Sequence, residues 1–189
     1  MFPVSVLFKY RKDFEAPTMA EGFAKVEKKK FIRNPWEPEY KNKAIILDAD
    51  DTVRRSSGEK VYPLKVQDVQ ILPKRKEILA KYQKDGYFIL GASNQSAIAK
   101  GELTLETAQA CFDRTNELLG MKIDWAFCPH RIPPLGCYCR KPQSGMYVHL
   151  IETYKLNPKN CVFVGDSTTD KTGATRLGMP FEEAEKFFK

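Results

Sequence analysis

The chain has 189 residues, 42% of them hydrophobic, and its 31 Lys and Arg residues against 24 Asp and Glu residues give a formal net charge of +7. This length and composition allow a buried core, which excludes wholesale disorder and predicts one folded domain. The chain has no apolar run of about 18 residues, as a membrane helix requires, and its start, MFPVSVLFKYRKDF, does not resemble a signal peptide, so we expect a cytoplasmic protein.

Predicted strands and helices alternate from residue 43 onward. Continuous apolar runs, typical of strands covered on both faces, lie at 43–49, 87–92, 124–127 and 161–165. Helical patterns lie between them, at 73–84, 104–119 and 146–154. The apolar stripe of the second helix is formed by Leu105, Ala108, Phe112 and Leu119. This alternation predicts an α/β fold with a doubly wound, Rossmann-like parallel sheet.

The N-terminal region differs from the rest of the chain. Residues 34–42 contain Pro35 and Pro38 and show little periodicity, so we expect residues 1–42 to be an extension and linker, and residues 43–189 to be the folded domain. The net charge is +4 over residues 1–43 and +3 over residues 44–189. The basic side chains of this region can be interpreted in two ways: as a surface that binds nucleic acid, or, more commonly, as a solvated basic arm. They are Lys25, Lys28, Lys29, Lys30 and Arg33.

Three acidic residues, Asp48, Asp50 and Asp51, follow the first predicted strand. Ligands of a doubly wound sheet gather outside the carboxyl ends of its strands. Asp is also common in turns and at helix N-termini, so a structural interpretation exists. Clustered carboxylates repel one another, however, unless a cation neutralises them. With a divalent ion, one carboxylate can bind Mg²⁺ and attack phosphorus while another, two residues on, transfers the proton.

A second acidic pair, Asp166 and Asp170, follows the strand at 161–165. A strand that ends in Gly-Asp can simply lead into a turn. Together with Asp48 and Asp50, however, this pair completes a site of oxygen ligands. Such a site favours Mg²⁺, which binds few carboxylates and keeps positions for water and a substrate phosphate.

Phosphate-binding groups are predicted at two further places. Ser93 and Asn94 follow the second predicted strand, where hydroxyl and backbone N–H groups can bind a phosphoryl oxygen. Lys141, beside Arg140, can neutralise phosphate charge, although a lone loop Lys is usually only solvated.

Three of the five Cys residues and one of the two His residues lie in a single stretch, CPHRIPPLGCYC. This spacing gives three thiolates and one imidazole, a soft tetrahedral set that suits Zn²⁺ and leaves no ligand position for a catalytic water. The alternative is a chance cluster of surface thiols. We expect loop 128–139 to hold a structural zinc ion through Cys128, His130, Cys137 and Cys139. Cys111 and Cys161 are assigned to the core.

The polar motifs together resemble those of the haloacid dehalogenase superfamily of phosphohydrolases. DADDT at 48–52, SNQS at 93–96, RKP at 140–142 and GDSTTD at 165–170 occur in the order and at the strand ends expected of that family. The resemblance covers residues 43–180. It implies a phosphatase in which Asp48 is the nucleophile that forms an aspartyl-phosphate and Asp50 is the acid and base.

The same resemblance implies binding roles. Asp48, the backbone carbonyl of Asp50 and Asp166 would hold Mg²⁺, with support from Asp170. Ser93 and Lys141 would steady the transferring group. Contacts to the substrate would come from Thr52, Asn94, Lys100 and Arg140. Asp51 stands where the family usually has Gly, which adds a carboxylate beside the nucleophile.

Features of the sequence point to two kinds of substrate. The metal loop resembles that of heptose bisphosphate phosphatases and of the histidinol-phosphate phosphatase domain, and SNQSAIAKG resembles the corresponding stretch of the heptose bisphosphate phosphatases. In contrast, RRSSGEKVYPLKVQDVQILP resembles polynucleotide kinase phosphatases, which remove a 3′-phosphate from nucleic acid ends, and APTMAEGFAKVEKKKF resembles part of their P-loop kinases. The chain contains no Walker A sequence, GxxxxGK[ST], so we expect no kinase activity.

The predicted domain leaves no room for a large cap, so we expect an open mouth shaped by the zinc loop and residues 53–69. We favour a small sugar-phosphate-type metabolite as the substrate over a polynucleotide 3′-end. A third alternative is a non-catalytic, zinc-stabilised module that binds nucleic acid and in which Asp51 has silenced the site. The retained acidic residues and Lys141 argue against that alternative.

Overall fold

The computed structural model describes residues 12–13, 15–22, 24–27, 39–131 and 137–189. The chain divides into two units, residues 1–34 and 35–189. In the first unit, the short 3-10 turn η1 (Met19–Glu21) follows Thr18, whose backbone N–H donates to Glu21 Oε1 at 2.8 Å. Lys25 pairs with Glu27. The other basic side chains predicted for the extension, Lys28, Lys29, Lys30 and Arg33, lie outside the described residues.

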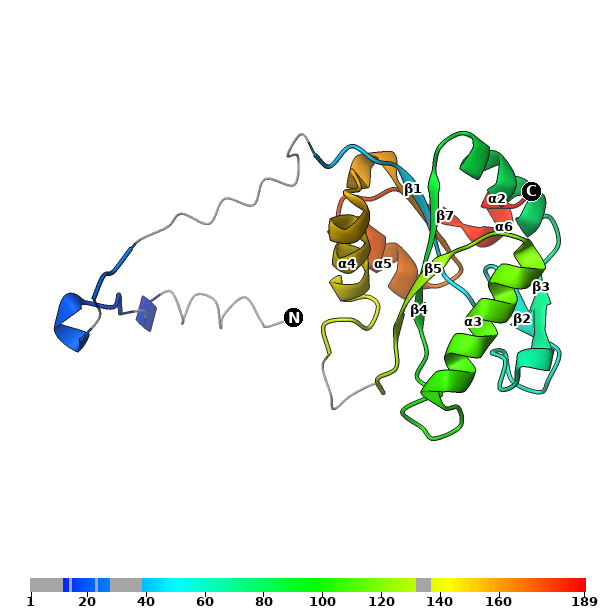
Figure 1. Cartoon of the computed structure of the whole chain (residues 1–189), viewed down its shortest axis with the longest axis horizontal. Helices are drawn as coiled ribbons and strands as arrows, with labels where there is room; N and C mark the ends of the chain where they lie inside the picture. The colour runs from blue at the N-terminus through cyan, green and yellow to red at the C-terminus, as the bar shows by residue number, and fades with distance from the viewer. Residues whose placement is uncertain (1–11, 14, 23, 28–38, 132–136) are drawn as a thin grey trace. The chain divides into compact units, whose positions relative to one another are not determined.

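The second unit is built on a five-stranded parallel sheet with the strand order β5-β4-β1-β6-β7 (Figure 1). The strands are β1 (Ala44–Leu47), β4 (Phe88–Asn94), β5 (Asp124–Cys128), β6 (Val162–Gly165) and β7 (Phe181–Glu183). The first four correspond to the predicted strands, and the α/β fold with a doubly wound sheet is confirmed. The sequence did not predict β7, because two of its three residues are exposed glutamates.

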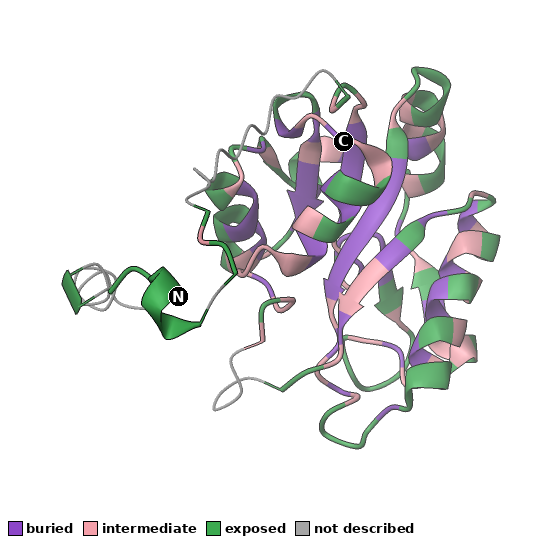
Figure 2. Ribbon diagram, turned by 60° about the vertical axis from the view of Figure 1, so that its left-hand side comes forward, coloured by how far each residue is buried: buried purple, intermediate pink, exposed green. Residues whose placement is uncertain are grey.

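Helices cover both faces of this sheet. The side chains of β1 alternate between the two cores: Ile46 packs with residues of α4 (Gly145–Tyr154) and α5 (Thr168–Arg176). Ile45 and Leu47 pack on the other face, with residues of α2 (Arg75–Lys84), α3 (Leu105–Leu119) and α6 (Ala184–Phe187). Figure 2 shows the buried residues concentrated in the central strands. Burial on both faces explains why these strands are continuous apolar runs.

The prediction that Leu105 belongs to the buried stripe of its helix is wrong. Helix α3 begins after Thr104, whose side chain caps it by accepting from the backbone N–H of Thr107, but Leu105 is 52% exposed. Leu105 is the first residue of the helix, and the helix meets the core only from Ala108 onward. Its buried stripe is formed by Ala108, Cys111, Phe112, Thr115 and Leu119. Cys111 and Cys161 are buried, as predicted.

The segment between β1 and α2, all of it described, carries only a small hairpin. This hairpin pairs β2 (Arg54–Ser56) with β3 (Val69–Ile71) in antiparallel fashion, and the 3-10 turn η2 (Val66–Asp68) precedes β3. A large cap domain is therefore absent at this position. Among the described helices, none has the length and apolar character needed to cross a bilayer.

The chain before β1 contacts the carboxyl end of α4. Asn42 Nδ2 donates to the backbone oxygen of Tyr154 at 2.8 Å, and the Tyr40 hydroxyl bonds to Glu152. Asn42 also forms a bridge to Leu156, which precedes the 3-10 turn η3 (Pro158–Asn160). Residues 40–42 therefore pack against the end of α4.

Candidate active site

The carboxyl ends of β1 and β6 bring three carboxylates together. Asp48 follows β1, whereas Asp166 follows β6 and Asp170 lies in the first turn of α5; one oxygen of each lies within 4.8 Å of the others. Lys141 Nζ lies 2.5 Å from Asp48 Oδ1 and 2.7 Å from Asp170 Oδ1, and both Lys141 and Asp170 are buried. Residues that are 93 positions apart in the sequence thus form direct contacts.

Local structure at the end of β6 fixes the carboxylate of Asp170. Ser167 caps α5: its backbone N–H and hydroxyl donate to Asp170 Oδ2 at 3.2 and 2.7 Å, which leaves Oδ1 for Lys141. Gly165 makes room for this carboxylate, since a Cβ at that position would lie 2.5 Å from Asp170 Oδ2. The GDSTTD motif is therefore a helix cap that aims a buried charge.

Burial controls the electrostatics of this cluster. It raises the pKa of Asp48 to about 7, against the lowering effect of Lys141. It also raises the pKa of Asp166, with a further contribution from the charge of Asp170. Burial disfavours the charged form of Lys141, but Asp48 and Asp170 outweigh this effect and its pKa is raised. Three carboxylates against one ammonium group leave excess negative charge, and their all-oxygen donor set fits Mg²⁺.

Asp50 is held at both carboxylate oxygens. Gln95 Nε2 donates to Asp50 Oδ2 at 2.9 Å and lies 3.0 Å from Ser93 Oγ, which links Asp50 to Ser93. Arg54 Nε donates to Asp50 Oδ1 at 3.0 Å. Gln95 and Arg54 are 3% and 1% exposed, so both bonds are shielded from water.

Arg54 was not predicted as a site residue, and Gln95 was predicted only as part of the stretch after Ser93 that could bind a phosphoryl oxygen. The contact between Gln95 and Asp50 could have been recognised, because Gln95 stands two residues after Ser93 and the side chains of an extended segment alternate between its sides. Arg54 gives no such signal: it belongs to a polar run, RRSSGEK, and its burial depends on residues of α3.

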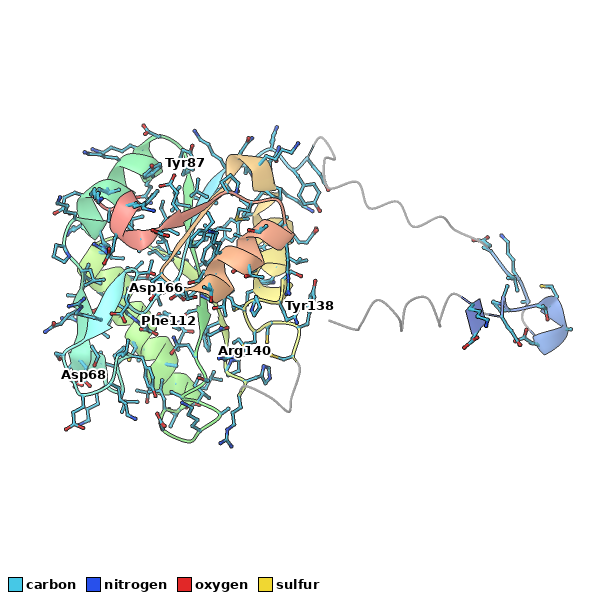
Figure 3. The ribbon with its side chains drawn as sticks, turned by 180° about the vertical axis from the view of Figure 1, so that it is seen from behind. Asp68, Tyr87, Phe112, Tyr138, Arg140 and Asp166 are labelled. Carbon is cyan, nitrogen blue, oxygen red and sulfur yellow. The ribbon has the colours of Figure 1, made fainter. Side chains whose placement is uncertain are left out.

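Asn94 and Arg140, two of the predicted substrate contacts, form hydrogen bonds with backbone groups of the segment between β5 and α4. Asn94 Nδ2 donates to the backbone oxygen of Lys141 at 3.2 Å, and Asn94 Oδ1 accepts from the backbone N–H of Lys141 at 3.0 Å. This pair of bonds fixes the backbone of Lys141. Arg140 Nη1 donates to the backbone oxygen of His130 at 3.2 Å. Both Arg140 and Asp166 are labelled in Figure 3.

Thr52 and Lys100 lie in contrasting surroundings. Thr52 is fully buried, and its hydroxyl has no hydrogen-bond partner among the described residues. Lys100 is exposed. After the hydrogen bond from Tyr62, the charges of Lys60 and Lys100 help to lower the pKa of Glu102. No described contact joins Lys100 to Asp48.

The four predicted metal ligands of the Cys and His loop also meet. Cys128 Sγ lies 3.5 Å from Cys137 Sγ and 3.3 Å from Cys139 Sγ, and His130 Nδ1 lies 3.2 Å from Cys139 Sγ. A tetrahedral ion with metal–sulfur bonds of about 2.3 Å separates its sulfur ligands by about 3.8 Å. The observed distances are close to this value, so the set fits one soft metal ion. Residues 132–136 of this loop lie outside the described residues.

The hairpin borders the site on the side of Asp50. Tyr62 and Leu64, from the loop between β2 and β3, pack with Ala97 and Leu103 from the loop after β4. The Tyr62 hydroxyl also donates to Glu102 at 2.6 Å. Residues of the segment 53–69, which was predicted to shape the mouth, therefore brace the segment that follows Ser93.

Asp51 does not contact Lys141. It is exposed and lines a groove of about 470 Å³ together with Asp166 and Lys171. Its backbone has φ of 59° in the left-handed region, which favours Gly, and among other residues Asp and Asn adopt it most readily. This backbone explains why a Gly is usual here and why Asp is tolerated.

Comparisons with known proteins agree with this geometry. Residues 43–188 match the family model described as "Polynucleotide kinase 3 phosphatase". A Thermoplasma volcanium protein, named "Probable D-glycero-D-manno-heptose-1,7-bisphosphate 7-phosphatase", is 32% identical over 144 residues, which cover 74% of this chain and 96% of the relative. The Pseudomonas putida D-glycero-beta-D-manno-heptose-1,7-bisphosphate 7-phosphatase is 33% identical over 140 residues, or 72% of this chain and 78% of the relative.

A solved structure shows the same fold. The D,D-heptose 1,7-bisphosphate phosphatase from B. bronchiseptica, complexed with magnesium and phosphate, is 30% identical and superposes with a TM-score of 0.66 over 74% of this chain and 78% of that one. The family match extends over most of the chain and coincides with the unit that carries the carboxylate cluster. The chain therefore belongs to the polynucleotide kinase 3 phosphatase family and is a phosphatase of the haloacid dehalogenase type.

Proposed function

We propose that this phosphatase hydrolyses a phosphomonoester of a sugar phosphate of the heptose bisphosphate type, with Mg²⁺ as its cofactor. The observation that carries the proposal is the cluster of Asp48, Asp166, Asp170 and Lys141 at the carboxyl ends of the strands. It is supported by relatives named as heptose-1,7-bisphosphate 7-phosphatases, and by one relative whose structure holds magnesium and phosphate.

In the proposed reaction, an oxygen of Asp48 attacks phosphorus while the bond from phosphorus to the sugar oxygen breaks. Asp50 donates a proton to that oxygen and so releases the alcohol. Asp50 then takes a proton from water, whose oxygen attacks phosphorus; the bond to Asp48 breaks and inorganic phosphate leaves. Ser93 and Thr52 bind phosphoryl oxygens, and the ammonium group of Lys141 neutralises part of their charge.

Asp48, Asp166 and the backbone carbonyl of Asp50 would hold Mg²⁺, with Asp170 orienting Lys141 beside them. The ion would supply neutralisation of the phosphoryl oxygens. The excess carboxylate charge of the cluster, only partly balanced by Lys141, supports this assignment.

The test compares the unaltered protein with Asp48→Asn. Purified protein should release phosphate from p-nitrophenyl phosphate only when Mg²⁺ is present, and Asp48→Asn should abolish this release. Circular dichroism and thermal unfolding check that the variant is folded. Activity that survives in the folded variant would contradict the assigned nucleophile.

A polynucleotide 3′-phosphate end is the second candidate substrate. It is supported by the family model and by the described segment between β1 and α2, which carries a small hairpin rather than a large cap. Rates on D-glycero-D-manno-heptose 1,7-bisphosphate, on histidinol phosphate and on a 3′-phosphorylated oligonucleotide, measured at equal concentration, distinguish the classes. A faster rate on the oligonucleotide would overturn the sugar-phosphate assignment. Salt-sensitive binding without hydrolysis would instead indicate a nucleic-acid-binding module.

The thiol and imidazole cluster is proposed to hold a structural Zn²⁺ ion. Three thiol groups and one imidazole whose ligand atoms all lie within 4.8 Å of one another support zinc over a harder ion. Metal analysis of protein prepared without chelator should find about one zinc ion per chain. Cys137→Ala should lose the ion, whereas Cys111→Ala, at a buried thiol of α3, should retain it. Preparations that contain no zinc would contradict the proposal.

A further inference from the structure

Arg54 is a buried charged side chain that contacts Asp50, and the proposed reaction does not use it. Only 1% of its surface is exposed, and its guanidinium group contacts three partners. Nε donates to Asp50 Oδ1 at 3.0 Å, Nη1 donates to Thr115 Oγ1 at 3.0 Å, and the guanidinium carbon lies 4.5 Å from the centre of the Phe112 ring.

These contacts connect Asp50 to the rigid part of the fold. Thr115 and Phe112 are both fully buried in α3, and the Thr115 hydroxyl donates onward to the backbone oxygen of Cys111 at 2.7 Å. A planar guanidinium group that is stacked and bonded in this way has little rotational freedom. The position of Asp50 Oδ1 is therefore set by a helix rather than by the loop that carries Asp50.

The two oxygens of Asp50 are not equivalent. Oδ1 faces the buried Arg54, whereas Oδ2 accepts from Gln95 Nε2, which also contacts Ser93 Oγ. Ser93 belongs to the proposed phosphate-binding group. Oδ2 is therefore the oxygen on the side of the substrate.

We propose that Arg54 is a positioning residue that binds Asp50 Oδ1 and thereby presents Oδ2 to the oxygen of the leaving group. This inference rests on the proposed role of Asp50 as acid and base. Arg54 itself does not touch the substrate; it acts by restricting the orientation of the carboxylate, since proton transfer requires the correct geometry.

The dependence of rate on the leaving group can test this role. The nitrophenolate of p-nitrophenyl phosphate leaves readily without a proton, whereas an alkyl oxygen needs one. The value of kcat/KM includes only steps up to transfer of the phosphoryl group to Asp48, so it reports the proton donor and not the later activation of water. A defect confined to Asp50 should therefore lower kcat/KM on the alkyl phosphate more than on the aryl phosphate.

The experiment measures kcat/KM for p-nitrophenyl phosphate and for whichever of heptose 1,7-bisphosphate and a 3′-phosphorylated oligonucleotide the unaltered enzyme hydrolyses faster. Asp50→Asn sets the scale, with an expected loss of about 10²–10⁴ on the alkyl phosphate. Arg54→Met should lose at least about tenfold more on the alkyl than on the aryl phosphate, and Arg54→Lys should recover part of that difference. Arg114→Met, which alters an Arg of α3 whose described ion pair is with the exposed Glu117, is the matched control and should behave like the unaltered enzyme.

If Arg54→Met does not fold, Thr115→Val replaces it, because this change removes the acceptor of Arg54 Nη1 without changing the size of the side chain. Thr115→Val should also lower kcat/KM more on the alkyl than on the aryl phosphate, by a smaller factor than Arg54→Met. Equal losses on both substrates, or no loss, would overturn the positioning role. Failure of the proposed function gives a different result: the unaltered enzyme would hydrolyse neither substrate with Mg²⁺, or Asp50→Asn would retain full activity on the alkyl phosphate.

Discussion

Lys141→Met gives a direct measure of the electrostatic balance in the carboxylate cluster. Lys141 is 4% exposed and forms ion pairs of 2.5 and 2.7 Å with Asp48 and Asp170. Removal of one partner from a buried ion pair typically costs about 3–5 kcal/mol, because the remaining charge is neither hydrated nor paired. For a chain of this size, each kcal/mol corresponds to about 2–4 °C in Tm, so the expected decrease is about 6–20 °C.

Thermal and urea unfolding should be measured in buffer that contains neither Mg²⁺ nor chelator, so that the Cys and His cluster keeps its metal. Addition of Mg²⁺ should then restore about 2.7 kcal/mol at a concentration 100 times its Kd. Lys171→Met, at an exposed residue, is the control and should change stability by no more than about 0.5 kcal/mol. A loss below about 1 kcal/mol for Lys141→Met without Mg²⁺ would refute the account of a buried, charge-balanced cluster.

Two other substitutions test how this cluster is held in place. Asn94→Ala removes both hydrogen bonds to the backbone of Lys141. It should lower kcat about tenfold in steady-state kinetics and lower the free energy of unfolding in urea by about 1–3 kcal/mol. An unchanged kcat would contradict the idea that Asn94 holds Lys141 in place. Gly165→Ala places a Cβ 2.5 Å from Asp170 Oδ2 and should lower the free energy of unfolding by about 1–3 kcal/mol. It should also raise the Mg²⁺ concentration that gives the half-maximal rate. A variant that changes neither quantity would show that Asp170 can move without consequence.

The central strands could be predicted because each is a run of apolar residues buried on both faces, as in Ala44–Leu47. Elements that depend on tertiary contacts could not. Helix α5, with the sequence TTDKTGATR, contains four Thr residues and a Gly that disfavour a helix. The cap formed by Ser167 and Asp170 stabilises its start, and Gly173 allows the helix to approach Tyr147, since a Cβ there would lie 2.5 Å from the Tyr147 hydroxyl.

The same distinction applies to the site. Asp48 and Asp166 could be predicted as site residues because they directly follow buried strands, and in a parallel sheet the carboxyl ends of the strands lie at one edge. Arg54 could not, because its burial results from Phe112 and Thr115, more than fifty residues away, and nothing in a polar run distinguishes an enclosed Arg from a solvated one. Carboxylates that meet at the strand ends can therefore be found by their place in the chain, whereas the residues that contact and orient a carboxylate depend on packing.

The position of Lys141 links the two candidate metal centres. A Lys side chain loses about 2 kcal/mol of rotamer entropy when it is fixed, so its backbone must be well placed for the ammonium group to reach both Asp48 and Asp170. Three features restrict this backbone. Cys139, two residues earlier, belongs to the Cys and His cluster, and the backbone oxygen of Tyr138 accepts from Gly145 at 2.9 Å. Asn94 binds the peptide groups on both sides of Lys141. A metal ion bound to Cys139 would thus act on the proposed reaction without touching the substrate, by restricting the chain that delivers the ammonium group to Asp48.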